Sequence, residues 1–130
     1  IGVGTGGNLK MVKGKSREQH NERLKATKHP TSLDIAWAAG FYEGEGWCGG
    51  KETTRVQICQ VDGEVLIWCQ ELFGGHIAKV YRNPLPGYEK HRNYWRWYLS
   101  GASARGFVMT IYKFLSHRRQ EQVKKVLGIV

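Results

Sequence analysis

Closely spaced glycines and prolines interrupt the chain from residue 31 onwards, and they restrict the fold to short helices and strands. The breaks are at Gly44 and Gly46, Gly49-Gly50, Gly74-Gly75, and Pro84-Leu85-Pro86-Gly87. The predicted helices are 33–43, 63–73, 102–115 and the stretch from a Ser116 cap towards Leu127. The predicted strands are two within 47–61, one at 76–82 and one at 93–99. The order is αββαββαα, an α+β domain with helices on one face of a curved antiparallel sheet.

The first thirty residues differ from the rest in composition. They hold seven basic and two acidic residues, which is +5 of the chain's net charge of +9. A helix over 16–27 with Ser16 as its cap is one possibility, although Leu24 and Ala26 give it almost no apolar stripe. We therefore expect a basic N-terminal arm at 1–30, flexible or ordered by a partner, followed by a single domain at 31–130.

The net charge of +9 favours a polyanionic partner, either nucleic acid or an anionic membrane surface. No apolar run is long enough to span a membrane, and no secretion signal is recognisable. The three cysteines form no CxxC pair, which argues against a disulfide framework and a structural zinc site. We expect an intracellular protein without a membrane partner, cytoplasmic or in an organelle or nucleoid, and not secreted. A solubilising or ribosome-type charged surface is the alternative.

The end of the first predicted helix combines small side chains with two carboxylates. Ala36, Ala39 or Gly40, and Glu43 recur at helical spacing, and such a stripe lets another helix approach closely. Glu43 and Glu45 stand where the helix dipole disfavours negative charge. A divalent cation such as Mg²⁺ would compensate them. A solvated helix end with two ordinary surface glutamates is the alternative.

The same segment, Ala38-Ala39-Gly40-Phe41-Tyr42-Glu43-Gly44-Glu45-Gly46, resembles the nonapeptide that names the LAGLIDADG homing endonucleases. Ala39-Gly40 resembles its small-residue middle, and Tyr42 to Gly46 resembles its acidic, glycine-rich end. The resemblance extends over residues 33–127. Its other parts are Ile58 to Asp62 with Glu64 to Leu66, Glu71 to Gly75, Trp97 to Gly101, and Phe114 to Ser116 with Arg118-Arg119.

The resemblance implies a metal-dependent DNA endonuclease, a phosphodiester hydrolase of the kind encoded by mobile introns or inteins. It implies that Glu45, where Asp is commoner in the family, binds the catalytic Mg²⁺ or another divalent cation at the scissile phosphate. The Gly44 carbonyl corresponds to a backbone metal ligand, and Gln60 corresponds to the residue that orients water. Arg118 or Arg119 would complete the site, and the spacing does not choose between them. No small-molecule organic cofactor is expected.

A single copy of the motif predicts a homodimer, because cutting both DNA strands requires two acidic helix ends. Packing Ala36, Ala39, Gly40 and Glu43 against their own copies would bring both Glu45 residues together on a two-fold axis. The predicted target is therefore a long, roughly palindromic site in double-stranded DNA.

Alternation within the strands separates a core face from a face for DNA. Trp95, Trp97 and Leu99 point one way and are assigned to the core, as are Trp37 and Trp68. The residues predicted to contact DNA are Lys51, Thr53, Arg55, Gln57, His76, Lys79, Arg82, Arg92, Tyr94, Arg96 and Tyr98. Which of them contact bases and which contact phosphates stays open, and so does a merely solvated strand face for any one of them.

Two other functions fit the same residues. A non-cleaving LAGLIDADG-fold binder of nucleic acid, either an RNA-splicing maturase or a transcription regulator, would keep the fold and the basic arm. A ribosomal or RNA-associated protein would share the charge alone.

Overall fold

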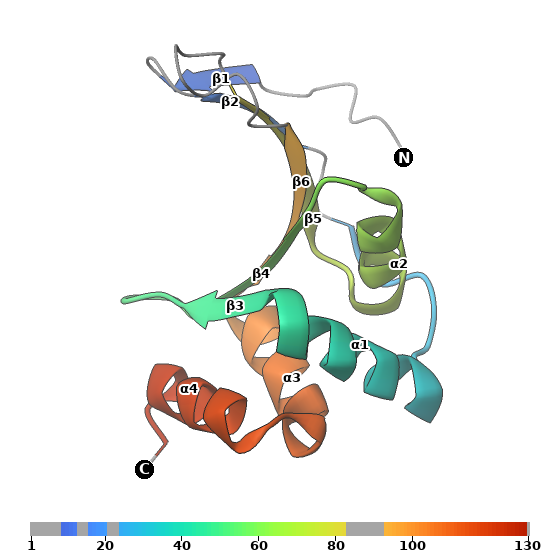
Figure 1. The fold of residues 1–130 in the computed structure, drawn as a ribbon, viewed down its shortest axis with the longest axis vertical. Helices are drawn as coiled ribbons and strands as arrows, with labels where there is room; N and C mark the ends of the chain where they lie inside the picture. The colour runs from blue at the N-terminus through green and yellow to red at the C-terminus, as the bar shows by residue number, and fades with distance from the viewer. Residues whose placement is uncertain (1–8, 13–15, 21–23, 83–92, 130) are drawn as a thin grey trace.

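A computed structural model describes residues 9–12, 16–20, 24–82 and 93–129 (Figure 1). Its strands are β1 (Leu9–Val12), β2 (Ser16–His20), β3 (Gly46–Gly49), β4 (Arg55–Gln60), β5 (His76–Arg82) and β6 (Tyr94–Ser100). Its helices are α1 (Ser32–Glu45), α2 (Glu64–Phe73), α3 (Ala102–Ile111), the 3₁₀ turn η1 (Tyr112–Phe114) and α4 (His117–Leu127). The protein is α+β, and from α1 onwards its elements follow the predicted order. The single helix predicted over 102–115 is instead α3 followed by η1.

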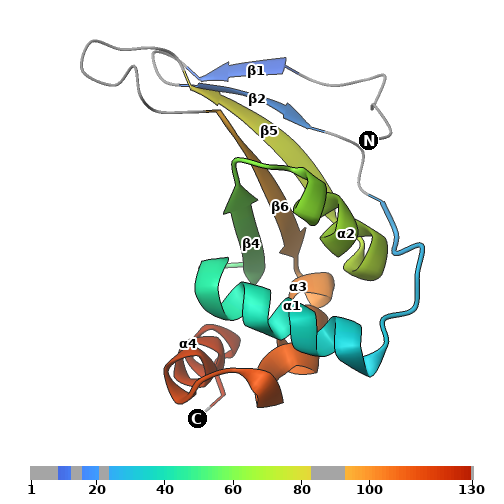
Figure 2. The same cartoon turned by 45° about the vertical axis from the view of Figure 1, so that its right-hand side comes forward.

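The strands form one antiparallel sheet in the order β1-β2-β5-β6-β4-β3. The sheet is strongly curved, and the helices lie on its convex side and below its lower end (Figures 1 and 2). The concave side carries no helix in either view. None of the helices in the described ranges is long and apolar enough to cross a bilayer.

The N-terminal segment adds two strands to this sheet. β2 pairs with β5, where His20 faces Ala78 and Ser16 faces Arg82, and β1 pairs with β2. The helix considered over 16–27 is therefore wrong. Its sequence has almost no apolar stripe to stabilise a helix by packing, whereas the edge of β5 offers backbone hydrogen-bond partners to a strand. The division into an arm at 1–30 and a domain at 31–130 stays a prediction, although β1 and β2 extend the domain's own sheet.

Helix α1 begins with a reciprocal cap. The Thr31 hydroxyl accepts a hydrogen bond from the Asp34 backbone N–H (3.1 Å), and the Asp34 carboxylate accepts one from the Thr31 backbone N–H (2.9 Å). At its other end the Gly46 N–H donates to the Tyr42 carbonyl, and Gly46 itself takes an extended conformation. The chain therefore passes from helix to strand without a loop, which places Glu45 directly at the start of β3.

The glycine pair after α2 allows three segments to meet. Gly74 and Gly75 have φ values of 73° and 101°, which side-chain-bearing residues rarely adopt. A Cβ on Gly74 would lie 2.8 Å from the Leu24 carbonyl oxygen, and one on Gly75 would lie 2.7 Å from the Tyr98 carbonyl oxygen. The pair therefore lets the N-terminal segment and β6 pack closely against the end of α2.

The core lies between the convex side of the sheet and the helices. The Phe107 ring on α3 makes edge contacts with Phe73, Trp97 and Tyr42, at centroid distances of 4.9, 5.3 and 6.1 Å. Trp97 is fully buried and its indole N–H donates to the Gly74 carbonyl (2.8 Å). These contacts tie α1, α2 and α3 to β6.

The assignment of tryptophans to the core is confirmed in part. Trp97 is central to the core and Trp95 packs against it. Trp37 and Trp68 are each 37% exposed, so their assignment to the core is wrong. Both line a hollow between α1 and α2, and the pattern of a single helix does not reveal how far a neighbouring helix covers it.

Candidate functional site

The junction of α1 with β3 brings two predicted site residues to the same end of the sheet. Glu45 is the last residue of α1, and Gly46, which follows it, pairs with Ile58 on β4. Gln60 ends β4 two residues after Ile58 and pairs with Trp95 on the core side, as its parity predicts. Antiparallel pairing therefore places the start of β3 beside the end of β4, where Glu45 is exposed and Gln60 is half-buried.

Glu43 is held by the N-terminus of α4. Its carboxylate accepts hydrogen bonds from the Ser116 backbone N–H (2.7 Å) and from the Ser116 hydroxyl (2.8 Å). The same hydroxyl accepts a hydrogen bond from the Arg119 N–H and so caps α4. These Ser116 hydrogen bonds, with help from Arg119 and Arg118, hold the pKa of Glu43 below its ordinary value. The negative charge at the end of α1 is thus compensated by the positive end of α4.

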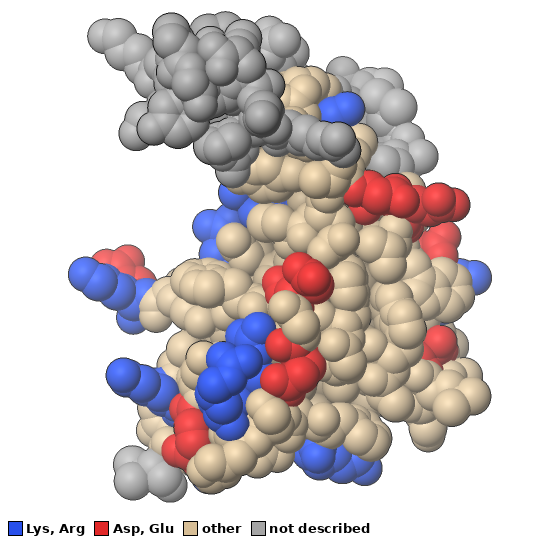
Figure 3. Space-filling model, viewed as in Figure 1, with Lys and Arg blue, Asp and Glu red and all other residues tan. Residues whose placement is uncertain are grey.

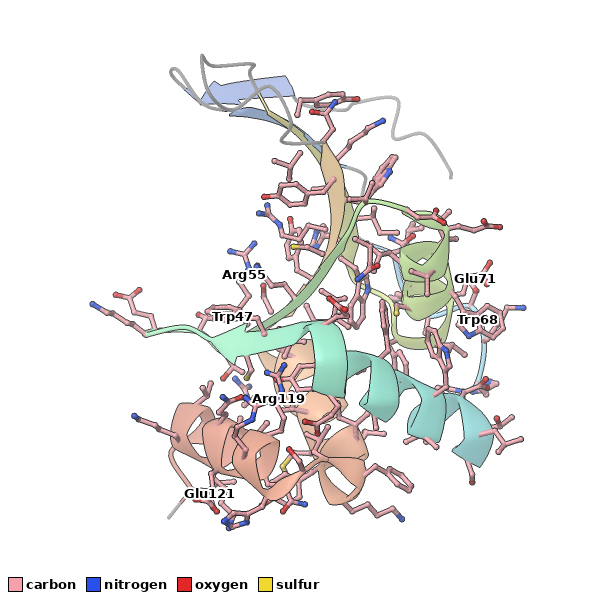
Figure 4. The ribbon with its side chains drawn as sticks, viewed as in Figure 1. Trp47, Arg55, Trp68, Glu71, Arg119 and Glu121 are labelled. Atoms are coloured by element: carbon pink, nitrogen blue, oxygen red, sulfur yellow. The ribbon has the colours of Figure 1, made fainter. Side chains whose placement is uncertain are left out.

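The two candidate arginines have different environments. The Arg119 side chain is 12% exposed, its Nε donates to the Glu43 backbone carbonyl (3.1 Å), and its guanidinium lies 5.2 Å from the Tyr42 ring centroid (Figure 4). The Arg118 side chain is 66% exposed, and its nearest carboxylate oxygen, on Glu43, is 3.9 Å away. Arg119 is therefore fixed to the end of α1, whereas Arg118 can reach a ligand outside the protein.

Glu45 has no comparable compensation. Among the residues that the structure describes, no hydrogen bond or ion pair reaches its carboxylate, and the last turn of α1 holds no basic residue. Gly44 beside it is also exposed. The described part of the chain contains no group of three or more His, Cys, Asp or Glu side chains that could hold a metal ion. One chain therefore offers one carboxylate with a neighbouring backbone carbonyl, which are hard oxygen donors suited to Mg²⁺ but only part of a coordination shell.

The concave side of the sheet presents a row of polar and aromatic side chains. The row consists of Trp47, Gln57, Tyr98 and His76, which are directly paired across β3, β4, β6 and β5. The His76 ring stacks on Tyr98, with centroids 4.9 Å apart and an interplanar angle of 12°. The neighbouring core residues Val56, Ile58 and Trp97 point to the other side and are buried. The predicted alternation of β4 and β6 is therefore confirmed.

Two arginines lie over this row. The Arg55 guanidinium is 4.5 Å and the Arg96 guanidinium 5.5 Å from the Tyr98 ring centroid. Figure 4 shows Arg55 and Trp47 projecting from the sheet on the side away from α2. We call Trp47, Arg55, Gln57, His76, Tyr94, Arg96 and Tyr98 the concave-face cluster. In Figure 3 several cations lie on this side of the molecule and several carboxylates lie on the side of α2, and carboxylates also lie beside cations at the centre and left of the view.

The other residues predicted to contact DNA are distributed differently. Lys79 pairs with Trp95 on the core side of the sheet, and its ammonium lies over the rings of Trp95 (5.0 Å) and Tyr81 (5.4 Å). Its assignment to the DNA face is therefore wrong, because the blurred alternation of β5 hides its parity. Lys51 and Thr53 are exposed in the β3–β4 connection. Arg82 ends β5 but its side chain is not described, and Arg92 lies outside the described residues.

Sequence reasoning did not select Trp47 for the concave face. Its side chain is 47% exposed, and it stands two residues after Glu45. The Trp47 ring lies over Gly49, where a Cβ would come within 2.4 Å of it. Strand alternation could have indicated this, since Trp47 and Cys48 are neighbours in β3 and point to opposite sides of the sheet. Cys48 is on the core side, where it pairs with the buried Val56.

The residues predicted for the dimer interface separate into two groups. Ala36 and Gly40 are exposed, and no described heavy atom lies within 4 Å of a Cβ built on Gly40. Ala39 is 1% exposed and packs in the core of its own chain, so its assignment to an interface is wrong. Glu43 is hydrogen-bonded to Ser116 of the same chain, and its place at an interface stays a prediction. The helix turns once every 3.6 residues, which places neighbouring small residues on different faces.

Replacing Glu43 by Gln is expected to lower the free energy of unfolding at pH 7 by about 1–2 kcal/mol, because α4 loses a charged cap partner. The pKa of Glu43 is lowered in the folded state, so its stabilisation is present above the ordinary value of 4.5 and disappears as the pH falls through the lower folded value. The variant should therefore lose less stability than the wild type as the pH falls from 4.5 through the folded pKa of Glu43. Urea unfolding followed by circular dichroism from pH 7 to pH 2.5 measures this difference.

Glu121→Gln provides the control for this measurement, since Glu121 pairs with Lys124 at 3.5 Å on the exposed side of α4 and such pairs contribute little. Wild type and Glu43→Gln losing stability in parallel throughout the acid range would contradict the assigned role of Glu43.

A scan against protein-family models gives no match to this chain, and a search of curated proteins gives no match at a useful level of significance.

Proposed function

We propose that this protein is a site-specific, double-stranded DNA endonuclease with the LAGLIDADG homing-endonuclease fold, acting as a homodimer with a divalent cation. The observation that carries the proposal is the exposed, uncompensated Glu45 carboxylate at the end of α1, where the concave side of the sheet begins. A buried catalytic carboxylate could not reach a phosphate in a duplex, whereas this one is open to solvent. An intracellular location follows from such a substrate.

The residues around Glu45 divide the chemistry of phosphodiester hydrolysis among them. When bound, a divalent cation supplies charge neutralisation at the phosphate and a water of lowered pKa. Glu45 and the Gly44 carbonyl would hold that cation. Gln60 has no useful pKa and serves to orient water by hydrogen bonds. Arg118 extends into solvent beside the same helix end, which suits a contact with a phosphate oxygen.

The concave-face cluster supports duplex DNA as the substrate. Antiparallel strands fit the major groove, where Arg pairs with guanine and Gln pairs with adenine. Arg55, Arg96 and Gln57 stand on adjacent strands of the concave side, and none of the described helices covers them. Arg–Tyr98 stacking holds the two guanidinium groups in place and reduces the side-chain entropy lost on binding.

The exposed side of α1 supports a homodimer. Ala36, Gly40 and Gly44 are exposed and form a small-residue surface that leads to Glu45. Two such helices packed about a two-fold axis would bring two Glu45 carboxylates to the centre of a symmetric site. Each chain would then cut one strand, and the site would be long and pseudo-palindromic.

A non-cleaving nucleic-acid binder, a splicing maturase or a transcription regulator, is the second candidate. It is favoured by the exposed Trp47 ring beside Glu45, because unpaired RNA bases are commonly recognised by stacking on such rings. It is also compatible with the incomplete metal-ligand set of a single chain.

Selection of cleaved molecules from a randomised duplex library in Mg²⁺ tests the proposed function directly. We expect an enriched, pseudo-palindromic site and cleavage that requires the metal. A library left uncut at every protein concentration, with single-stranded RNA outcompeting duplex DNA for binding, would support the second candidate instead.

Arg118 and Arg119 are expected to differ when each is replaced by Ala. Arg118→Ala should leave stability within about 0.5 kcal/mol of wild type and slow cleavage about 10²-fold, because an exposed phosphate contact is lost. Arg119→Ala should lower the free energy of unfolding by about 1–2 kcal/mol, because it loses its bond to the Glu43 carbonyl and its contact with Tyr42. Urea unfolding and single-turnover cleavage of the selected site measure both quantities, and reversed effects would contradict these roles.

A further inference from the structure

We propose that the groove between α1 and α2 binds a basic peptide segment of a protein partner, one that combines Lys or Arg side chains with an apolar anchor. The α1–α2 groove is a shallow hollow of about 860 Å³ on the convex side of the molecule. Leu33 and Trp37 from α1 and Val65 and Trp68 from α2 form its apolar surface. It takes no part in the site proposed around Glu45.

The apolar surface of the α1–α2 groove is open to solvent. Leu33 is 82% exposed, and Trp37 and Trp68 are each 37% exposed. Two tryptophans and a leucine gathered in one hollow are the kind of exposed apolar surface that marks a protein contact. Their rings offer an anchoring surface for an aliphatic side chain and π-faces for a cation.

Carboxylates surround this apolar surface in a strongly basic protein. Eight acidic side chains have described positions, and half of them line the groove: Asp34, Asp62, Glu64 and Glu71. Asp34 caps α1, the Asp62 carboxylate accepts a hydrogen bond from the Glu64 N–H (3.0 Å), and Glu64 lies favourably in the first turn of α2. The positions of three of these four carboxylates are therefore explained by their roles at the starts of α1 and α2.

The position of Glu71 has no such structural explanation. It lies in the last turn of α2, where the helix dipole disfavours a negative charge and no basic residue of the helix is present. No ion pair of its carboxylate with another described residue is found. A cation supplied from outside would compensate Glu71 together with the other three carboxylates.

The chain itself shows how the groove accommodates a cation. The Lys28 ammonium lies 5.3 Å from the Trp68 ring centroid, and the Lys28 backbone N–H donates to the Glu71 carbonyl (3.1 Å). Figure 4 shows Trp68 and Glu71 on the side of α2 away from the sheet's concave side. Lys28 is not among the residues that line the hollow, so Trp37 and the four carboxylates remain available for a second basic segment.

Charge selects among the possible occupants. Nucleic acid is repelled by the four carboxylates that line the groove. A second copy seated in the groove itself would bring the same four carboxylates rather than their complement. A basic peptide with an apolar anchor can pack against the aromatic surface and form ion pairs with the carboxylates.

The test uses the full chain and a panel of fluorescein-labelled twelve-residue peptides with four Lys or Arg residues and one Leu or Ile at varied positions. Matched peptides carry Glu in place of the basic residues. The groove variant is Glu64→Gln/Glu71→Gln, and the control variant of equal net charge is Glu52→Gln/Glu121→Gln, whose glutamates lie outside the groove. Circular dichroism confirms that both fold.

We expect at least one basic peptide to bind, with an affinity about tenfold weaker for the groove variant and unchanged for the control, and no binding of the acidic peptides. Trp68→Ala should weaken the same peptide. Failure of the whole panel to bind, equal binding to both double variants, or peptide binding abolished by self-association of the chain through Leu33 and Trp37 would each overturn the proposal. None of these results depends on DNA cleavage, so they test peptide binding by the groove independently of the proposed endonuclease function.

Discussion

Glu45→Gln is expected to slow cleavage of the selected DNA site by roughly 10³-fold while leaving the affinity for that DNA unchanged or slightly increased. The side chain keeps its size and loses only its charge, so the cation is held less tightly and the scissile phosphate is less well neutralised. Because Glu45 has no partner among the described residues, the free energy of unfolding should stay within about 0.5 kcal/mol of wild type. Single-turnover cleavage and DNA-binding titrations measure the two effects.

Glu52→Gln is the matched control, since Glu52 is also exposed but lies in the connection between β3 and β4. It changes the net charge by the same amount and should leave cleavage within about twofold of wild type. Equal losses in both variants would assign the effect of Glu45 to long-range charge and not to its place in the site.

Gly40→Arg is expected to separate folding from assembly. A Cβ at position 40 would have no described heavy atom from outside its own stretch of helix within 4 Å, and replacing a mid-helix glycine usually stabilises the helix by about 0.5–1 kcal/mol. In the proposed dimer each chain would place one arginine in the same contact. Each arginine would destabilise the dimer by overpacking of about 1–3 kcal/mol, so the two together would cost twice that amount. The dimer dissociation constant should rise about 30- to 10⁴-fold.

Sedimentation velocity measures the assembly, and cleavage at a protein concentration below the new dissociation constant should fall in proportion. Gly40→Ala is the control, because a methyl group adds helix stability with far less obstruction. A Gly40→Arg protein that stays dimeric and active would place the dimer contact elsewhere on the molecule.

The sequence predicted most of the architecture, because the local signals of each element agree with the fold. The glycine pair at 74–75 and the Thr31 and Ser116 caps mark the boundaries of α1, α2 and α4 within one or two residues. Alternation placed Val56, Ile58 and Trp97 in the core and Arg55 and Tyr98 on the opposite side. The N-terminal strands were not predicted, since a strand at a sheet edge depends on the partner edge and not on its own pattern.

The candidate site was predicted less completely, since its details depend on contacts between distant segments. The bond between Glu43 and Ser116 joins residues 73 positions apart, and no spacing within α1 reveals it. The difference between Arg118 and Arg119 arises from the docking of α4 against the end of α1. Trp37 and Trp68 line a groove that two helices form together, so the pattern of neither helix alone reveals it.

The Glu43 contact also suggests why Glu45 alone remains available. Of the two carboxylates at the end of α1, Glu43 is used to attach α4, and this attachment brings Arg118 beside the helix end. Structural and proposed catalytic roles therefore fall on adjacent acidic residues of the same turn.

The central claim is that each chain contributes one Glu45 to the cutting of one strand. Wild type and Glu45→Gln protein, refolded together in equal amounts, test it on a supercoiled plasmid that carries the selected site. Mixed dimers should accumulate nicked circles, with wild-type dimers giving linear DNA and variant dimers giving neither. Linear product in direct proportion to the wild-type chain, with no nicked circles at any mixing ratio, would contradict the account.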